Sequence, residues 1–154
     1  LTGPGRSLYD GAREGAVLLK KKWKILLACV VIVTVACAAA WYLLPRPAVG
    51  EDYEVQYINV GETLENITGQ IDQNTCNALN DLLRQAERRG YRRNVFPRQL
   101  REDTVQIIGV DSNGPWFFEL DGEACVLCDG QRGGYPIIDG EGLLKQVWAL
   151  LPEP

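Results

Sequence analysis

Residues 104–128 read TVQIIGVDSNGPWFFELDGEACVLC, and this stretch decides the fold of the globular part of the chain. Thr104–Val110 and Trp116–Leu120 are rich in β-branched and aromatic residues, which favour strands. A D-S-N-G-P turn signal separates them, and a second turn at Asp121-Gly122 leads into Ala124–Cys128. The stretch therefore predicts an antiparallel meander, which Tyr135–Ile138 extends by one short strand.

Two amphipathic segments flank the meander. Asp72–Arg89 carries apolar residues at three- and four-residue steps, and Gly142–Leu151 carries a similar apolar stripe that ends at Pro152. Both are predicted to be helices, with Asp72 and Asp139 as N-caps.

One further strand precedes the first helix. Glu51–Val60 alternates between apolar and polar residues, so either Tyr53, Val55 and Tyr57 or the rival set Ile58 and Val60 faces the core. The predicted fold is α+β, a small two-layer domain with both helices on one face of the antiparallel sheet. The expected core, besides the first strand, is Leu79, Leu83, Ile107, Trp116, Phe118, Val126, Leu143 and Val147.

A long apolar segment precedes this domain. Ile25–Leu44 contains twenty residues without a charge, and as a helix it would span about 30 Å, the hydrocarbon thickness of a bilayer. Trp23 and Trp41-Tyr42 suit the two membrane interfaces, and Pro45 stops the helix. We therefore expect a tail over residues 1–24, a single-pass transmembrane helix over 25–44, a linker over 45–52 and the globular domain over 53–154. Residues 1–19 are glycine-rich and are expected to fold poorly.

The charges around the span predict its orientation. Lysines 20, 21, 22 and 24 precede it, whereas only Arg46 follows closely, which favours a cytoplasmic N-terminus and an extracytoplasmic domain at the cell membrane. Two alternatives remain open. A signal peptidase could cut near Ala38, or Cys29 or Cys37 could carry a lipid.

Composition excludes several classes of function. Residues 48–154 contain nine basic and eighteen acidic side chains, a net charge of −9, which argues against nucleic-acid binding. The chain has no histidine, which excludes histidine-activated nucleophiles and histidine-containing zinc sites. We therefore predict no cofactor, no metal site and no catalytic residue.

Cys125 and Cys128 form a C-x-x-C pair, a pattern found in redox disulfides and thiolate metal sites. Here the pair lies in a predicted strand, where residues three apart point to opposite faces. Ordinary strand residues are therefore the favoured interpretation. A structural disulfide, which could involve Cys76, and a thiol redox site are the alternatives.

A second candidate site is an arginine island within the acidic domain. It runs from Arg84 to Arg101, and Arg88, Arg89, Arg92 and Arg93 are its predicted anion or partner contacts. The alternative is a solvated helix end that balances neighbouring carboxylates.

The sequence thus predicts a membrane-anchored accessory or sensing domain that binds a protein partner of the cell envelope without catalysis. The runners-up are a thiol-dependent redox protein and an anion-binding module.

Overall fold

The computed structural model describes residues 8–93, 99–128, 130 and 133–152, and it divides the chain into two compact units, Leu1–Trp41 and Tyr42–Pro154. Helix α1 (Leu8–Leu43) makes up the described part of the first unit and ends just inside the second. Its segment Lys22–Leu43 has a mean hydropathy of 2.5 and is long and apolar enough to cross a membrane. A signal sequence near an N-terminus meets the same criteria.

Helix α1 begins earlier than the sequence indicated. We expected residues 1–19 to fold poorly, yet the helix starts at Leu8 and continues through Gly11 and Gly15. A helix gains one hydrogen bond for each residue added once it is nucleated. The apolar segment supplies the nucleus, and this gain offsets the cost of about 1 kcal/mol for each glycine.

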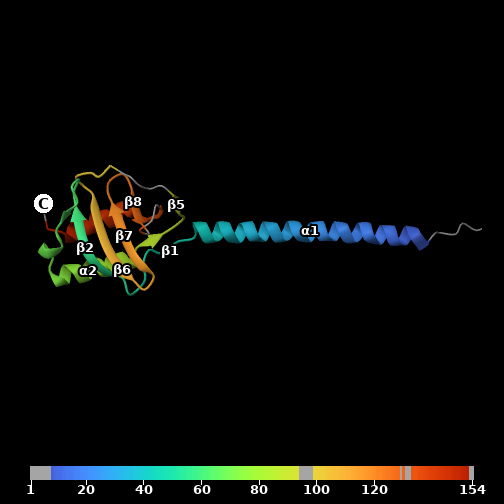
Figure 1. The fold of residues 1–154 in the computed structure, drawn as a ribbon, viewed down its shortest axis with the longest axis horizontal. Coiled ribbons are helices and arrows are strands. Elements are labelled where there is room, and N and C mark those ends of the chain that lie inside the picture. Colours follow the sequence, from blue (N-terminus) through green and yellow to red (C-terminus); the bar gives the residue numbers. More distant parts are fainter. Residues whose placement is uncertain (1–7, 94–98, 129, 131–132, 153–154) are drawn as a thin grey trace, which may run out of the picture. The chain divides into compact units, whose positions relative to one another are not determined.

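The second unit is built on an antiparallel sheet (Figure 1). Within the described residues it has seven strands in the order β3-β2-β6-β7-β8-β9-β5. Their bounds are β2 Glu54–Val60, β3 Glu65–Asn66, β5 Arg92–Arg93, β6 Val105–Asp111, β7 Gly114–Leu120, β8 Cys125–Cys128 and β9 Gly133–Pro136. A separate ladder joins β1 (Arg46–Pro47) to β4 (Glu87–Arg88). Because β6, β7, β8 and β9 follow one another in the chain and in the sheet, the predicted meander is confirmed.

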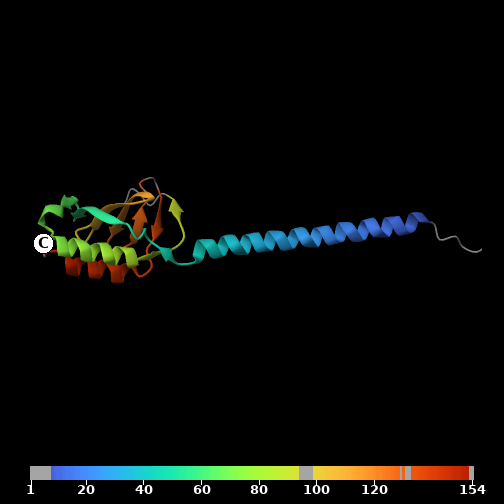
Figure 2. The same cartoon turned by 90° about the horizontal axis from the view of Figure 1, so that it is seen from below.

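Helices α2 (Gln73–Gln85) and α3 (Gly140–Leu150) pack against each other and lie on the same face of the sheet (Figure 2). A short 3₁₀ helix, η1 (Thr68–Gln70), precedes α2. The domain is therefore α+β, as predicted. Asp72 caps α2 as expected, because its side chain accepts hydrogen bonds from the backbone N–H groups that begin the helix.

Two details of the predicted helices are wrong. Helix α2 ends at Gln85 and not at Arg89, because Ala86 is extended and residues 87–88 pair with β1 as strand β4. Asp139 precedes α3 but its side chain forms no capping hydrogen bond. Its backbone is left-handed, with φ 51°, and its carbonyl rather than its carboxylate accepts the N–H of Leu143.

The core lies between the helices and the sheet. Leu79, Leu83, Ile107, Phe118, Leu143 and Val147 are buried there as predicted. Trp116 is only half-buried. Val126 is buried but lies outside this cluster, because its cross-strand partner Glu119 belongs to the opposite face of the sheet.

Strand β2 combines the two sets of core residues that the sequence offered as rivals. A β-bulge between Val55 and Tyr57 leaves Gln56 without a cross-strand partner. Tyr53 and Val55 face the core before the bulge, and Ile58 faces it afterwards. Tyr57, predicted with the first set, is 52% exposed on the other face, because the extra residue inverts the alternation.

Candidate functional site

The arginine island does not form one surface in the structure. Arg84 turns inward, and its Nε and Nη2 donate to the carbonyl oxygen of Tyr53 at 3.1 and 2.8 Å. Arg101 lies elsewhere and pairs with Asp103 at 3.2 Å and Glu123 at 2.6 Å. These two arginines therefore serve local structure, which leaves residues 88–93 as the candidate site.

Arg88 is the structural centre of that candidate site. Strand pairing places it opposite Arg46, and its Nε donates to the carbonyl oxygen of Pro47 at 3.2 Å. Its guanidinium carbon lies 4.0 Å from the ring centroid of Tyr135 and 5.0 Å from that of Trp116. Cation–π contacts of this kind stabilise a desolvated arginine.

The surroundings of Arg88 lower its pKa from the ordinary value, first through burial and also through the nearby charge of Arg46. An arginine nevertheless stays protonated in a protein. The site therefore holds a half-buried positive charge between a strand ladder and two aromatic rings.

Two more tyrosines extend these rings into what we call the arginine–aromatic cluster: Arg88, Trp116, Tyr135, Tyr91 and Tyr42. The rings of Tyr91 and Tyr135 meet edge to face with centroids 5.1 Å apart. The hydroxyl of Tyr42 donates to the carbonyl oxygen of Tyr91 at 2.8 Å, and the carbonyl oxygen of Tyr42 accepts the N–H of Gly90 at 2.9 Å. The cluster thus lies where the chain enters the globular unit.

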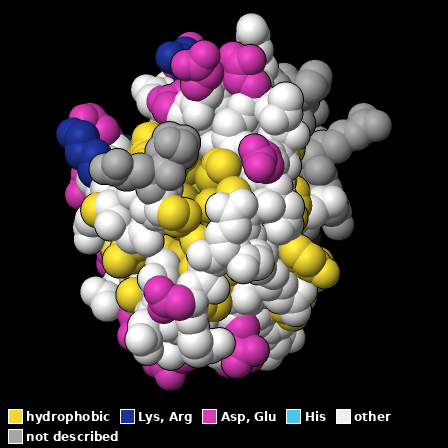
Figure 3. Space-filling view, turned by 90° about the vertical axis from the view of Figure 1, so that its left-hand side faces the viewer, with side chains coloured by type: hydrophobic (Ala, Val, Ile, Leu, Met, Phe, Trp, Pro, Cys, Tyr) yellow, Lys and Arg dark blue, Asp and Glu magenta, His cyan; other side chains and the backbone are white. Residues whose placement is uncertain are grey.

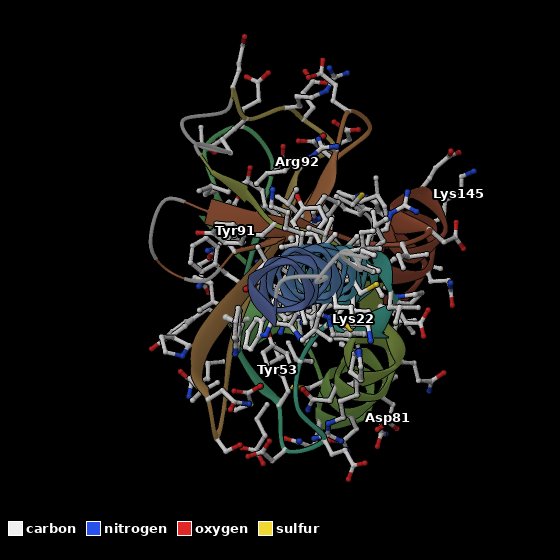
Figure 4. The ribbon with its side chains drawn as sticks, turned by 90° about the vertical axis from the view of Figure 1, so that its right-hand side faces the viewer. Lys22, Tyr53, Asp81, Tyr91, Arg92 and Lys145 are labelled. Carbon is white, nitrogen blue, oxygen red and sulfur yellow. The ribbon has the colours of Figure 1, made fainter. Side chains whose placement is uncertain are left out.

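Arg89 and Arg92 flank the cluster, and both side chains are exposed. Neither forms an ion pair with any residue that the structure describes. Arg93 belongs to β5, but its side chain and the whole of Arg98 lie outside the described residues. Tyr91 and Arg92 are labelled in Figure 4, which shows Lys145 projecting from α3 apart from them.

Cys125 and Cys128 lie on β8 and point to opposite faces of the sheet, so the strand does not bring the two thiols together. Cys125 is half-buried beside Gly140 at the start of α3, and its Sγ lies 3.6 Å from the carbonyl oxygen of Asp121. Cys128 is buried and pairs across the ladder with Phe117. The structure shows no disulfide among the described cysteines, Cys76 included.

The described residues contain no group of three or more potential metal ligands. Asp111 and Asp121 act as turn residues: Asp111 accepts the N–H of Asn113, and Asp121 accepts the N–H groups of Glu123 and Ala124. A surface depression of about 490 Å³ is lined by Glu62, Gln99, Leu100, Arg101, Glu102, Asp103 and Glu123. Its arginine is already paired with carboxylates, so it offers no free cation.

Sequence reasoning named Arg88 but missed the aromatic rings around it. The sequence pattern predicts Trp116 as a core residue and Tyr135 as part of a short strand. The contacts depend on the β1–β4 ladder, which joins residues about forty positions apart and leaves no local pattern. Tyr42 near Arg46 and Tyr91 beside Arg92 are the local signal in the sequence, whereas nothing near Trp116 indicates its contact with an arginine.

Comparisons of the chain with protein-family models, with curated proteins and with solved structures found no match.

Proposed function

We propose that the chain is a single-pass membrane protein with a cytoplasmic N-terminus, whose extracytoplasmic α+β domain binds a protein partner of the cell envelope and catalyses no reaction itself. The observation that carries this proposal is the exposed apolar helix Lys22–Leu43, followed directly by a compact domain. Its side chains are exposed along its whole length, and a lipid bilayer is the environment that would cover them.

The flanking residues support the span and its direction. Trp23 and Trp41 are exposed near its two ends, where amphipathic rings suit a membrane interface. Lys22 and Lys24 lie at its start, and lysines 20 and 21 precede them in the sequence. This bias in positive charge favours retention of the N-terminal end in the cytoplasm.

Membrane fractionation tests the anchor. We expect the protein to resist carbonate extraction, and protease added to intact cells should remove the globular domain. Release by carbonate, or a mature mass that lacks residues 1–40, would contradict the proposal and favour a cleaved signal. Added mass of an acyl chain would favour the lipoprotein alternative.

One face of the domain has the composition expected of a partner-binding surface. Figure 3 shows hydrophobic side chains near its centre with acidic side chains around them. The segment between β2 and α2 lies at the corresponding end of Figure 1, and its Leu64 and Ile71 are half-buried. Contiguous exposed apolar side chains with a polar rim are typical of interaction sites.

Leu64 adds an independent indication. Its backbone has φ 52° in a left-handed conformation, which costs a leucine about 1–2 kcal/mol. Strain of this kind is concentrated at functional positions. A leucine at a position where asparagine or glycine would fit more easily supports a role for its side chain in contact with a partner.

Crosslinking in membranes tests the partner. Aspartate also tolerates the left-handed backbone, so Leu64→Asp keeps that conformation and places a charge in the segment between β2 and α2. We expect it to abolish the crosslinked species. Tyr57→Asp makes the same change on the sheet face away from the helices and should leave that species intact. Recovery of the protein alone from wild-type membranes would refute partner binding.

The thiol alternative gains no support from the geometry, because the two sulfur atoms belong to opposite faces of β8. A Cys125→Ser, Cys128→Ser double variant should therefore keep the wild-type crosslinks. Dithiol reductase activity that the double variant loses would instead establish the redox function.

A further inference from the structure

We propose that Arg89 and Arg92 bind the phosphate groups of anionic phospholipids in the bilayer that the chain crosses, and so hold the globular domain at the membrane surface. This inference rests on the proposed function, since a retained span is what keeps the domain beside lipid. It assigns a ligand to exposed cations that no carboxylate of the described residues neutralises.

The first support is the pairing of charges. Arg84, Arg101 and Lys145 each form an ion pair with a carboxylate. In a domain with a net charge of −9, carboxylates are abundant, yet Arg89 and Arg92 have none beside them among the described residues. Their charges are therefore available to an anion that is not part of the globular domain.

The second support is the short distance in space between the two arginines and Tyr42, near the end of the uncharged stretch. The N–H of Gly90 lies 2.9 Å from the carbonyl oxygen of Tyr42, two residues before the uncharged stretch ends at Leu44. Arg89 and Arg92 are within two residues of Gly90, so their Cα atoms lie within about 7 Å of it. The headgroup layer on each side of a bilayer is about 5–8 Å thick. The Cα atoms of both arginines therefore lie within about the thickness of one headgroup layer from Gly90, which contacts Tyr42 near the end of the uncharged stretch.

The third support is the chemistry of the neighbouring side chains. Arg88 is held by the carbonyl of Pro47 and by two aromatic rings, so it contributes a fixed positive charge next to Arg89 in the chain. Tyr42 and Tyr91 contribute phenol groups of the kind that are enriched at membrane interfaces. Arginine presents planar N–H donors that match a phosphate group in a bidentate manner.

The experiment uses the full chain reconstituted in nanodiscs of phosphatidylcholine alone or mixed with phosphatidylglycerol. The rates at which phenylglyoxal modifies Arg89 and Arg92 are measured by peptide mass spectrometry. We expect phosphatidylglycerol to slow both modifications about five-fold, the effect of one cation bound at an anionic surface. Arg101, paired within the protein, should react at the same rate in both discs.

Native mass spectrometry of lipids retained by detergent-extracted protein supplies the second measurement. Arg89→Gln with Arg92→Gln should lose the preference for phosphatidylglycerol. Arg101→Gln with Lys145→Gln removes the same net charge from other surfaces and should keep it. Arg89→Lys with Arg92→Lys should retain most of the preference because both charges remain.

Four results would overturn the inference. They are equal modification rates in the two kinds of disc, equal protection by inorganic phosphate added to phosphatidylcholine discs, an equal loss of lipid in the matched control, and an unchanged preference in the Gln pair. Carbonate extraction of the membranes that contain each variant distinguishes failure of this inference from failure of the membrane anchor. A chain that stays in the membrane without lipid preference refutes the inference alone.

Discussion

The phenol of Tyr53 gives a sharp test of the packing. Its ring is fully buried, and it meets Phe118 edge to face with centroids 5.9 Å apart. The hydroxyl oxygen is also buried and has no hydrogen-bond partner among the described residues. Replacing Tyr53 with Phe keeps the ring and removes only this oxygen.

The expected change is an increase in stability. A buried polar group without a partner costs about 1–3 kcal/mol. The cavity that the oxygen leaves is smaller than the volume of one water molecule, which is about 30 Å³. At 24 cal/mol per Å³, such a cavity lowers the stability by at most about 0.7 kcal/mol. The free energy of unfolding of Tyr53→Phe should therefore exceed that of the wild type by about 0.5–2 kcal/mol.

The same residue predicts a difference at alkaline pH. Burial first, and the negative charge of Asp111 second, raise the pKa of Tyr53 above its ordinary value of 10.0. The unfolded chain then loses this proton at a lower pH than the folded chain does. The wild type should lose stability above about pH 10, by up to about 1.4 kcal/mol per pH unit. The Phe variant should lack this contribution.

Urea unfolding of fragment 42–154, followed by the fluorescence of Trp116 and Trp148, measures both effects. A Tyr53→Phe fragment that is less stable than the wild type by 1 kcal/mol or more (about the net value of one hydrogen bond) would show that the hydroxyl has a partner. Parallel alkaline profiles for the two fragments would refute the expected pKa.

Substitutions at three other positions test the domain by the same assay. Gly109→Ala would place a Cβ against the ring of Tyr53 and 2.5 Å from the carbonyl oxygen of Glu54, and should cost about 3 kcal/mol; a neutral effect would contradict the close approach. Burial opposes ionisation of Asp111, but N–H donors outweigh it and lower its pKa below 3.8. Wild-type stability should therefore fall as the pH drops below about 4, and Asp111→Asn should flatten that slope; an unchanged slope would be incompatible with these bonds. Leu64→Ile should lose at least 1 kcal/mol, because a β-branched residue fits the left-handed region poorly, whereas Leu64→Asn should stay within about 1 kcal/mol of the wild type; equal losses would argue against backbone strain.

Local patterns predicted most of the fold. Turn residues marked the meander, and apolar periodicity marked both helices, because these signals depend on neighbours in sequence. The sequence does not predict the end of α2, because Glu87 and Arg88 leave the helix to form backbone pairs with β1. That partner strand lies about forty positions earlier in the chain, so no local pattern indicates the pairing. Asp139 failed as a cap because its side-chain chemistry was visible but its left-handed backbone was not.

The candidate site was predicted only in part. The arginines were evident as a run of charge, but their separation into paired, stacked and exposed members required the fold. Arg84 and Arg101 acquire their partners through contacts of thirty-one and twenty-two positions in sequence. No spacing rule distinguishes them from Arg89 and Arg92, which stay exposed.

Because of the bulge in β2, deletions at different positions in this strand have different effects on which side chains face the core. Removing Gln56 would make Val55 and Tyr57 consecutive opposite Gly109 and Ile108, so the strand would alternate regularly and Tyr53, Val55 and Ile58 would all keep their inner positions. Removing Asn59 would instead keep the bulge, turn Val60 outward and shift the pairing with β3 by one residue. A homologous chain that lacks Gln56 would therefore need no compensating apolar substitutions in this strand, whereas one that lacks Asn59 would need them from Val60 onward.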